Sequence, residues 1–204
     1  MKNMEHIISA VIGYACGCIN FAFIISKLKG FDIRDTGSGN AGASNVKIAL
    51  GWKYGIFTAL CDILKAVLAT LLCQKLFPSV SLAPYIGGTF AVLGHIYPFY
   101  MNFKGGKGYA SYTGMILALN WKLALCMMLY GVVVTLVTDY IFIATVSTTV
   151  IVFLYYLYKK AEAGVLILLA LLAVIITYKH KINFIRLKNH EEIGLRKSGK
   201  HRVK

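Results

Sequence analysis

Long apolar stretches separated by short polar loops constrain the fold of this 204-residue chain more than any other feature. A helix needs about 20 apolar residues to cross the hydrocarbon core of a bilayer. The candidate spans are residues 4–26, 54–77, 83–100, 109–119, 121–137, 140–158 and 163–178. The fourth and fifth are separated at Asn120, which indicates a short helix and a longer one that turn there. We therefore predict an all-α, polytopic membrane protein of about seven transmembrane helices.

The composition also favours a membrane protein. Only 15% of the residues are charged and 58% are hydrophobic, whereas a soluble domain carries about 25% charged residues. At this length one domain is the default, so we expect residues 1–204 to form a single integral-membrane domain. The five cysteines lie in apolar stretches without metal-ligand spacing, which indicates neither a zinc site nor a disulfide framework. We expect no metal and no cofactor.

Residues 37–45, the first glycine loop, are rich in glycine and in small polar side chains. Glycine permits left-handed backbone and close approach, and successive exposed N–H groups suit a phosphate. The loop lacks the Gly-Lys-[Ser/Thr] end of a nucleotide-binding P-loop. A flexible turn that caps the next helix is the alternative interpretation.

Residues 103–108, the second glycine loop, carry Lys104 and Lys107 on either side of a Gly-Gly pair. Two lysines at this spacing can bracket one phosphate with both charge and backbone donors. The alternative is two ordinary lysines on the cytoplasmic side of a membrane protein. His95 precedes the loop, and a histidine near a helix end is as often structural as catalytic.

A third cluster follows the last candidate span. If that helix continues, His180, Asn183 and Arg186 share one face, and Glu192 follows. A basic juxtamembrane helix is the alternative. Asp62 and Lys65 lie inside the second candidate span, where charge is costly, so we expect them to pair or to face the interior.

The distribution of Lys and Arg predicts the orientation in the membrane. With seven spans, 16 of the 22 Lys and Arg residues lie on the side of both glycine loops and the tail, and five lie on the other side. Lys and Arg accumulate in cytoplasmic loops. We therefore expect both glycine loops and the tail in the cytoplasm, with the tail against anionic lipids. Nucleic acid is not expected as a partner, because no aromatic platform accompanies the lysines of the tail.

Together the three motifs resemble one family closely. It comprises the bacterial integral-membrane glycerol-3-phosphate acyltransferases that use acyl phosphate as donor. The resemblance covers nearly the whole chain and rests on residues 37–45, on Gly-His-x-x-Pro with Phe-Lys-Gly-Gly-Lys-Gly after it, and on residues 179–192. It implies seven spans in the bacterial inner membrane, a cytoplasm-facing site and formation of lysophosphatidic acid from acyl phosphate and glycerol 3-phosphate. It also implies functional coupling to an enzyme that produces acyl phosphate.

The same resemblance implies roles for individual residues. By motif match, catalytic roles fall to Ser38, Lys107, His180 and Asn183. Contacts with substrate or phosphate fall to a larger set, which is Gly37, Gly39, Asn40, Asn45, His95, Lys104, Gly105, Gly106, Gly108 and Glu192. Lys47 does not match the motif but is a further candidate for a phosphate contact.

The chain departs from the family pattern at three places. The usual Gly-Ser-Ile-Pro of the first span reads Gly-Cys-Ile-Asn at residues 17–20, and the usual Gly-Thr-Glu reads His-Glu-Glu at residues 190–192. Ile48 stands where the family has an arginine that grips a substrate phosphate. Lys47 lies one position earlier, which on a helix is a rotation of about 100°. We therefore expect Lys47 to point elsewhere unless the backbone adjusts.

Two other functions stay open on the sequence alone. A non-catalytic relative could bind or sense a phosphorylated lipid precursor, its chemistry lost with the arginine. A transporter of organic phosphate would usually place charged residues at mid-membrane, in paired halves. In this chain only Asp62 and Lys65 lie deep within a candidate span.

Overall fold

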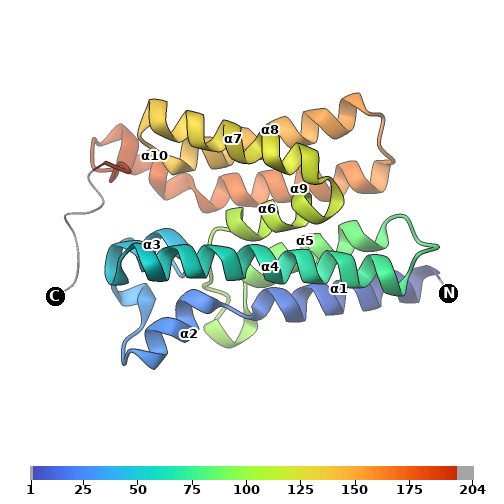
Figure 1. The fold of residues 1–204 in the computed structure, drawn as a ribbon, viewed down its shortest axis with the longest axis horizontal. Helices are drawn as coiled ribbons and strands as arrows, with labels where there is room; N and C mark the ends of the chain where they lie inside the picture. The colour runs from blue at the N-terminus through green and yellow to red at the C-terminus, as the bar shows by residue number, and fades with distance from the viewer. Residues whose placement is uncertain (1, 197–204) are drawn as a thin grey trace. The chain divides into compact units, whose positions relative to one another are not determined.

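A computed structural model describes residues 2–196, which form helices joined by turns (Figure 1). No strand occurs in this part of the chain, so the predicted all-α class is confirmed. The chain divides into two compact units, of which the structure describes residues 2–119 and 120–196. That the two units act as one functional domain stays a prediction.

The first unit ends with α6, and the second begins with α7. The helices of the first are α1 (Lys2–Cys18), α2 (Phe21–Leu28), η1 (Ile33–Asp35), α3 (Ala43–Leu50), α4 (Trp52–Leu76), α5 (Ala83–Ile96), η2 (Phe99–Met101) and α6 (Tyr109–Leu119). The helices of the second are α7 (Trp121–Thr138), α8 (Ile141–Tyr158), α9 (Ala163–Lys179) and α10 (Lys181–Lys188). Asn120 caps α7 by accepting from the N–H of Leu123, as the predicted break at this position requires.

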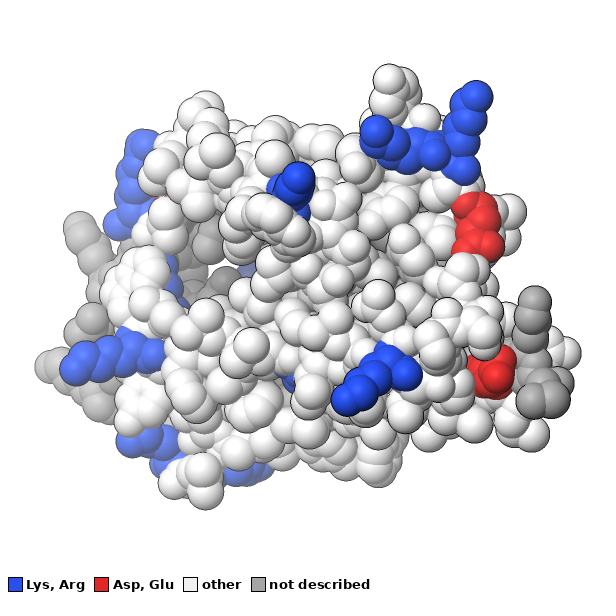
Figure 2. All heavy atoms as spheres, turned by 45° about the vertical axis from the view of Figure 1, so that its right-hand side comes forward, with Lys and Arg blue, Asp and Glu red and all other residues white. Residues whose placement is uncertain are grey.

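Several helices are long and apolar enough to cross a membrane. By length and composition, the described residues contain four such spans, or five if α9 and α10, bent by 42°, count as one. Side chains other than Lys, Arg, Asp and Glu cover most of the face in Figure 2, as contact with lipid requires. Helices α5 and α6 have only 14 and 11 residues, or about 21 and 17 Å. The count of seven spans stays a prediction.

The first candidate span, residues 4–26, is not one continuous helix. It is interrupted between α1 and α2, where the Oδ1 of Asn20 accepts from the N–H of Phe23 and so caps α2. The Nδ2 of Asn20 donates to the carbonyl oxygen of Ala41. The break therefore ties the first membrane helix to the first glycine loop.

Helix α5 is the interior helix of the first unit. It packs against α1, α4 and α6, and α1, α4 and α5 run side by side in Figure 1. A Cβ on Gly13 of α1 would lie 2.1 Å from the carbonyl oxygen of Gly87, and one on Gly17 would lie 2.1 Å from that of Ala91. Glycines four residues apart let membrane helices approach this closely. Because its neighbours shield it, α5 can be short and still carry the buried His95 at its end.

This close contact generates a prediction about stability. Gly17→Leu should lower the free energy of unfolding by about 1–3 kcal/mol or more, because the new side chain forces α1 and α5 apart. Val11→Leu is the matched control, since Val11 lies on the same helix with 62% of its surface exposed. Thermal unfolding of the detergent-solubilised proteins measures both. Equal melting temperatures for the two variants would contradict the described contact.

Candidate functional site

The first glycine loop is held together from within by Asn45 of α3. The Asn45 side chain is buried, and its Oδ1 accepts from the N–H of Ser38 at 2.8 Å. Its Nδ2 donates to the carbonyl oxygens of Ile33 and Thr36 at 2.8 and 3.0 Å. Such a hydrogen-bonded core argues against the alternative of a flexible turn. We infer that Asn45 shapes the loop, and its direct contact with a ligand stays a prediction.

Glycine is needed where the loop turns around Asn45. Gly37 and Gly39 have φ of 55° and 73°, in the left-handed region. A Cβ on Gly37 would lie only 2.3 Å from Asn45 Oδ1. Ser38 and Asn40 are half-buried between these turns. The loop therefore presents Ser38 and Asn40 on a fixed backbone.

Arg34 ties the base of the first glycine loop to η2. Its Nε and Nη2 donate to the carboxylate of Asp32 at 3.0 and 2.8 Å, and its Nη1 donates to the carbonyl oxygen of Met101 at 2.9 Å. The guanidinium holds the pKa of Asp32 well below its usual range, so the pair is ionised at neutral pH. This pair fixes the first glycine loop to the segment that leads into the second.

Lys47 does not take the place of the missing family arginine. Its Nζ lies 4.1 Å from the centre of the Trp52 ring, in a cation–π contact, and burial lowers its pKa. Ile48 instead faces the loop, with its Cγ2 3.3 Å from the position of a Cβ on Gly37. Lys47 thus points elsewhere, as its helical position predicts. Its contact with a phosphate stays a prediction and would require it to leave Trp52.

The second glycine loop folds onto the end of α5. The N–H of Gly105 donates to the carbonyl oxygen of Ile96, and that of Gly106 donates to the carbonyl oxygen of His95, both at 3.0 Å. A Cβ on Gly105 would lie 2.2 Å from the carbonyl oxygen of His95. We expected the backbone N–H groups of this loop to bind a phosphate. The N–H groups of Gly105 and Gly106 instead cap α5, so this expectation is revised. The two glycines are needed for close approach to the helix end.

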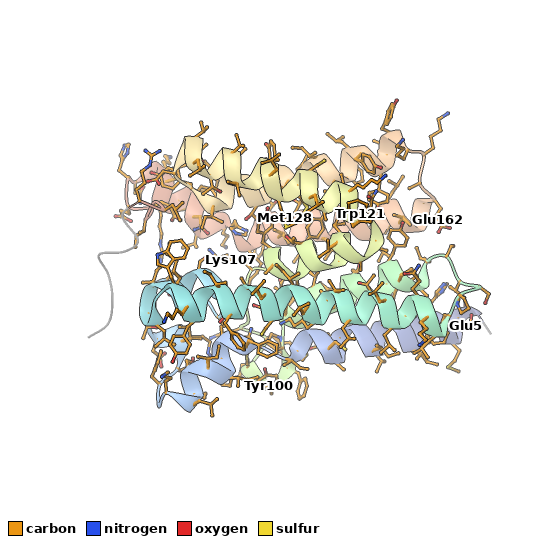
Figure 3. The ribbon with its side chains drawn as sticks, in the orientation of Figure 1. Glu5, Tyr100, Lys107, Trp121, Met128 and Glu162 are labelled. Atoms are coloured by element: carbon orange, nitrogen blue, oxygen red, sulfur yellow. The ribbon has the colours of Figure 1, made fainter. Side chains whose placement is uncertain are left out.

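The charged part of this loop is better placed for a ligand. Lys104 is exposed and Lys107 is half-buried, and Lys107 is labelled in Figure 3. Gly108 has φ of 95°, where glycine is favoured, and leads directly into α6. The loop therefore presents two lysines from a backbone that is fixed at both ends.

The two glycine loops meet at Gly106. A Cβ on Gly106 would lie 2.0 Å from His95 Nε2 and 2.9 Å from the carbonyl oxygen of Ala41. Ala41 belongs to the first loop and also accepts from Asn20. The structure thus brings both loops and His95 together within the first unit, which the sequence motifs left as separate segments.

A buried ion pair lies below this junction. Lys65 Nζ lies 2.7 Å from Asp62 Oδ1, and both side chains are almost fully buried. The predicted pairing is confirmed. Lys65 also donates to the carbonyl oxygen of Ile19 at 2.7 Å, and its Nζ lies 3.0 Å from His95 Nδ1. The involvement of His95 was not predicted from the sequence.

The third motif lies in the second unit. The helix does not continue as expected, because α9 ends at Lys179 and the chain bends by 42° into α10. The side chain of Asn183 is buried and donates to Glu192 Oε1 at 2.6 Å. His180 Nδ1 lies 2.8 Å from the carbonyl oxygen of Ile176. His180, Asn183 and Glu192 are thus held in one cluster of this unit, since the N–H of Asn183 also donates to the carbonyl oxygen of His180.

The segment that carries Glu192 is anchored at the turn between α7 and α8. The N–H of Leu195 donates to the carbonyl oxygen of Asp139 at 2.8 Å, and that of Arg196 donates to Asp139 Oδ1 at 3.0 Å. Gly194 permits this contact, because a Cβ there would lie 1.9 Å from Asp139 Oδ2. These bonds hold the chain after α10 and so hold Glu192 near Asn183.

The sequence model of a family described as glycerol-3-phosphate acyltransferase matches residues 7–190. The chain belongs to the glycerol-3-phosphate acyltransferase family. A member from Oceanobacillus iheyensis, named glycerol-3-phosphate acyltransferase 1, is 37% identical over 94% of this chain and 96% of its own length. One from Thermosipho melanesiensis is 39% identical over 93% of this chain and 92% of its own.

Solved structures of this acyltransferase family are also similar. One is a crystal structure of PlsY, an integral membrane glycerol 3-phosphate acyltransferase, in its glycerol 3-phosphate form. It has a TM-score of 0.87 and 35% identity over 93% of this chain and 95% of that one. The lysophosphatidic acid form has a TM-score of 0.83 and 34% identity over 93% and 94% of the two chains. The family recognised from the three motifs and the membrane class are therefore confirmed.

Two residues that organise the acyltransferase loops were missed by the sequence argument. Asn20 stands where the family usually has a proline, and both residues suit a break before a new helix. The replacement of the family's proline by Asn20 could therefore have indicated the helix break. No sequence pattern indicated the role of Arg34, because its partner Met101 is 67 residues away.

The role assigned to Asn45 can be tested by substitution. Asn45→Ala removes three hydrogen bonds, so we expect a loss of about 1–3 kcal/mol in stability and faster amide exchange across residues 37–45. Ser44→Ala is the control, because Ser44 is the exposed neighbour on the same helix. Hydrogen–deuterium exchange with mass spectrometry measures the exchange rates of the loop amides directly. Unchanged exchange in Asn45→Ala would show that the loop is ordered by other contacts.

Proposed function

We propose that this chain transfers the acyl group of an acyl phosphate to the 1-hydroxyl of glycerol 3-phosphate, giving lysophosphatidic acid and phosphate. The observation that carries this is the junction of the two glycine loops, where Ser38 and two lysines are presented from fixed backbone. The extent of the family match supports it. The two similar PlsY structures are described as its glycerol 3-phosphate form and its lysophosphatidic acid form.

The proposed reaction depends on positioning of the substrates and on positive charge near the phosphates more than on covalent catalysis. An acyl phosphate is an activated anhydride, so the 1-hydroxyl attacks the acyl carbon, the new ester bond forms and the bond to phosphate breaks. Holding both reactants in line can supply roughly 7–11 kcal/mol. Lys104 and Lys107 compensate the phosphate charge, and the hydroxyl of Ser38 donates to a phosphate oxygen. No cofactor enters this reaction.

The proton of the attacking hydroxyl needs an acceptor. His180 Nδ1 lies 2.8 Å from a carbonyl oxygen, so this nitrogen donates and Nε2 is the accepting nitrogen of the neutral ring. That tautomer suits a general base. We therefore propose that His180 takes the proton and Asn183, oriented by Glu192, holds glycerol 3-phosphate. His95 and the substrate's own phosphate are the other two candidate acceptors.

We also propose that the reaction takes place at the cytoplasmic face of the bacterial inner membrane. The excess of Lys and Arg around both glycine loops supports this side. The donor would then come from an enzyme that produces acyl phosphate and acts on the same membrane.

One observation favours a second candidate, a non-catalytic relative that binds a phosphorylated lipid precursor. Ile48 faces the first glycine loop where the family has an arginine, and Lys47 lies on Trp52. An assay decides between the two. Purified protein in lipid receives palmitoyl phosphate and glycerol 3-phosphate, with acyl-CoA as the donor control. Equal release of phosphate and lysophosphatidic acid from acyl phosphate alone supports the enzyme, whereas binding without product supports the relative.

The same assay tests the lysines. Lys107→Ala should reduce kcat/KM by about 100-fold or more, because a charged donor to the substrate phosphate is lost. Lys53→Ala is the control, since Lys53 is an exposed lysine in the first turn of α4. The melting temperature of both variants should match that of the wild type. Wild-type turnover in Lys107→Ala would remove Lys107 from the proposed site.

A further inference from the structure

The contacts of Lys65 define the protonation of His95. An ammonium group has only N–H donors, and Lys65 Nζ lies 2.7 Å from the carbonyl oxygen of Ile19 and 3.0 Å from His95 Nδ1. Its contact with Asp62 Oδ1 is a short ion pair without hydrogen-bond alignment. Since the lysine can only donate, a hydrogen bond between the two groups requires His95 Nδ1 to accept. A neutral imidazole with an accepting Nδ1 carries its proton on Nε2.

The other protonation states of His95 fit these contacts less well. A proton on Nδ1 would point at the ammonium group, which is closer than the Asp62 oxygen, at 3.0 against 3.3 Å. A doubly protonated ring would add a second positive charge beside one buried carboxylate, at a high desolvation cost. The Nε2–H tautomer of the neutral ring is therefore the one that the cluster selects.

The protonated nitrogen lies at the junction of the two glycine loops. His95 Nε2 is 2.0 Å from the position of a Cβ on Gly106, and the carbonyl oxygen of Ala41 is 2.9 Å from that position. The same cluster also holds the break after α1, because Lys65 donates to Ile19 and the neighbouring Asn20 donates to Ala41. One buried cluster thus contacts the second glycine loop at Gly106 and the helix break at Ile19, and the neighbouring Asn20 links that break to the first glycine loop.

We propose that Asp62 and Lys65 are positioning residues that hold His95 as its Nε2–H tautomer, and so fix the two glycine loops that present Ser38 and Lys107. In this tautomer His95 donates at the junction and is not the general base. The catalytic consequence rests on the proposed acyltransferase function, whereas the tautomer does not. A buried ion pair is weak evidence for stability, so a role in positioning also accounts for two charges inside a membrane helix.

The tautomer can be measured without any assay of activity. The protein is labelled with ¹⁵N-histidine and studied in lipid by solid-state NMR, and the His95 signals are identified by their loss in His95→Gln. We expect an unprotonated Nδ1 and a protonated Nε2 in the wild type. In Asp62→Leu/Lys65→Met both tautomers should appear, because the donor to Nδ1 is gone. A protonated Nδ1 in the wild type would overturn the proposal.

Activity measures the consequence for the loops. Asp62→Leu/Lys65→Met removes both charges with apolar side chains of similar size, an exchange that is often neutral for stability. We expect at most a small fall in melting temperature, from the hydrogen bond lost at Ile19, and a loss of kcat/KM of about 100-fold, which a misplacement near 1 Å can cause. Leu64→Met/Leu68→Met is the control, because both leucines are exposed on α4. Wild-type activity in the charge-free variant would overturn positioning by the ion pair.

A second pair of variants keeps the ion pair and covers the case in which the charge-free variant fails to fold. The amide nitrogen of Gln can reach the place of Nε2, whereas that of Asn reaches only the place of Nδ1. His95→Gln should therefore retain at least about ten times the kcat/KM of His95→Asn. Equal losses, or a better Asn variant, would contradict a donor at Nε2. If the wild type forms no lysophosphatidic acid, the proposed function fails, and the NMR result alone decides the tautomer.

Discussion

Backbone that is not helical must find its hydrogen bonds inside the protein where it is buried, because water cannot reach it there. The first unit meets this constraint with a few polar side chains. Asn45 holds one backbone group of the first glycine loop and two of the segment before it, Asn20 caps α2 and reaches Ala41, and Arg34 holds Met101. Glycine-rich segments are often flexible, but these are braced from several directions. The candidate site is therefore formed by ordered loops.

The same constraint explains why glycine occurs where it does in the second loop. Gly105 and Gly106 donate to the last carbonyl groups of α5, which would otherwise lack partners at a buried helix end. Only a residue without Cβ can come this close to the His95 ring and carbonyl oxygen. The lysines beside the glycines are left to supply charge. Neighbouring residues of one short motif thus have separate roles, since the glycines cap α5 and the lysines provide positive charge for a ligand.

The helices and the family could be predicted from the sequence, because apolar stretch length and motif spacing are local properties. The break at Asn120 was predicted for the same reason, and its cap is present. The break at Asn20 was not, because residues 4–26 form one long apolar stretch and the exchange of the family's proline for Asn20 was the only local sign of it. The partners of Gly105 and Gly106 were also missed, because a Gly-Gly pair indicates close approach without saying to what. The bend after Lys179 was hidden by the uninterrupted helical pattern of residues 179–186.

The contact between α1 and α5 has a consequence for how this sequence can change over evolutionary time. Where two backbones touch, as at Gly13 with Gly87 and Gly17 with Ala91, no side chain lies between them that could be exchanged in compensation. A larger residue on one helix cannot be matched by a smaller one on the other. Substitution at these positions is therefore disfavoured, and the lipid-facing sides of the helices are the surfaces on which drift costs least.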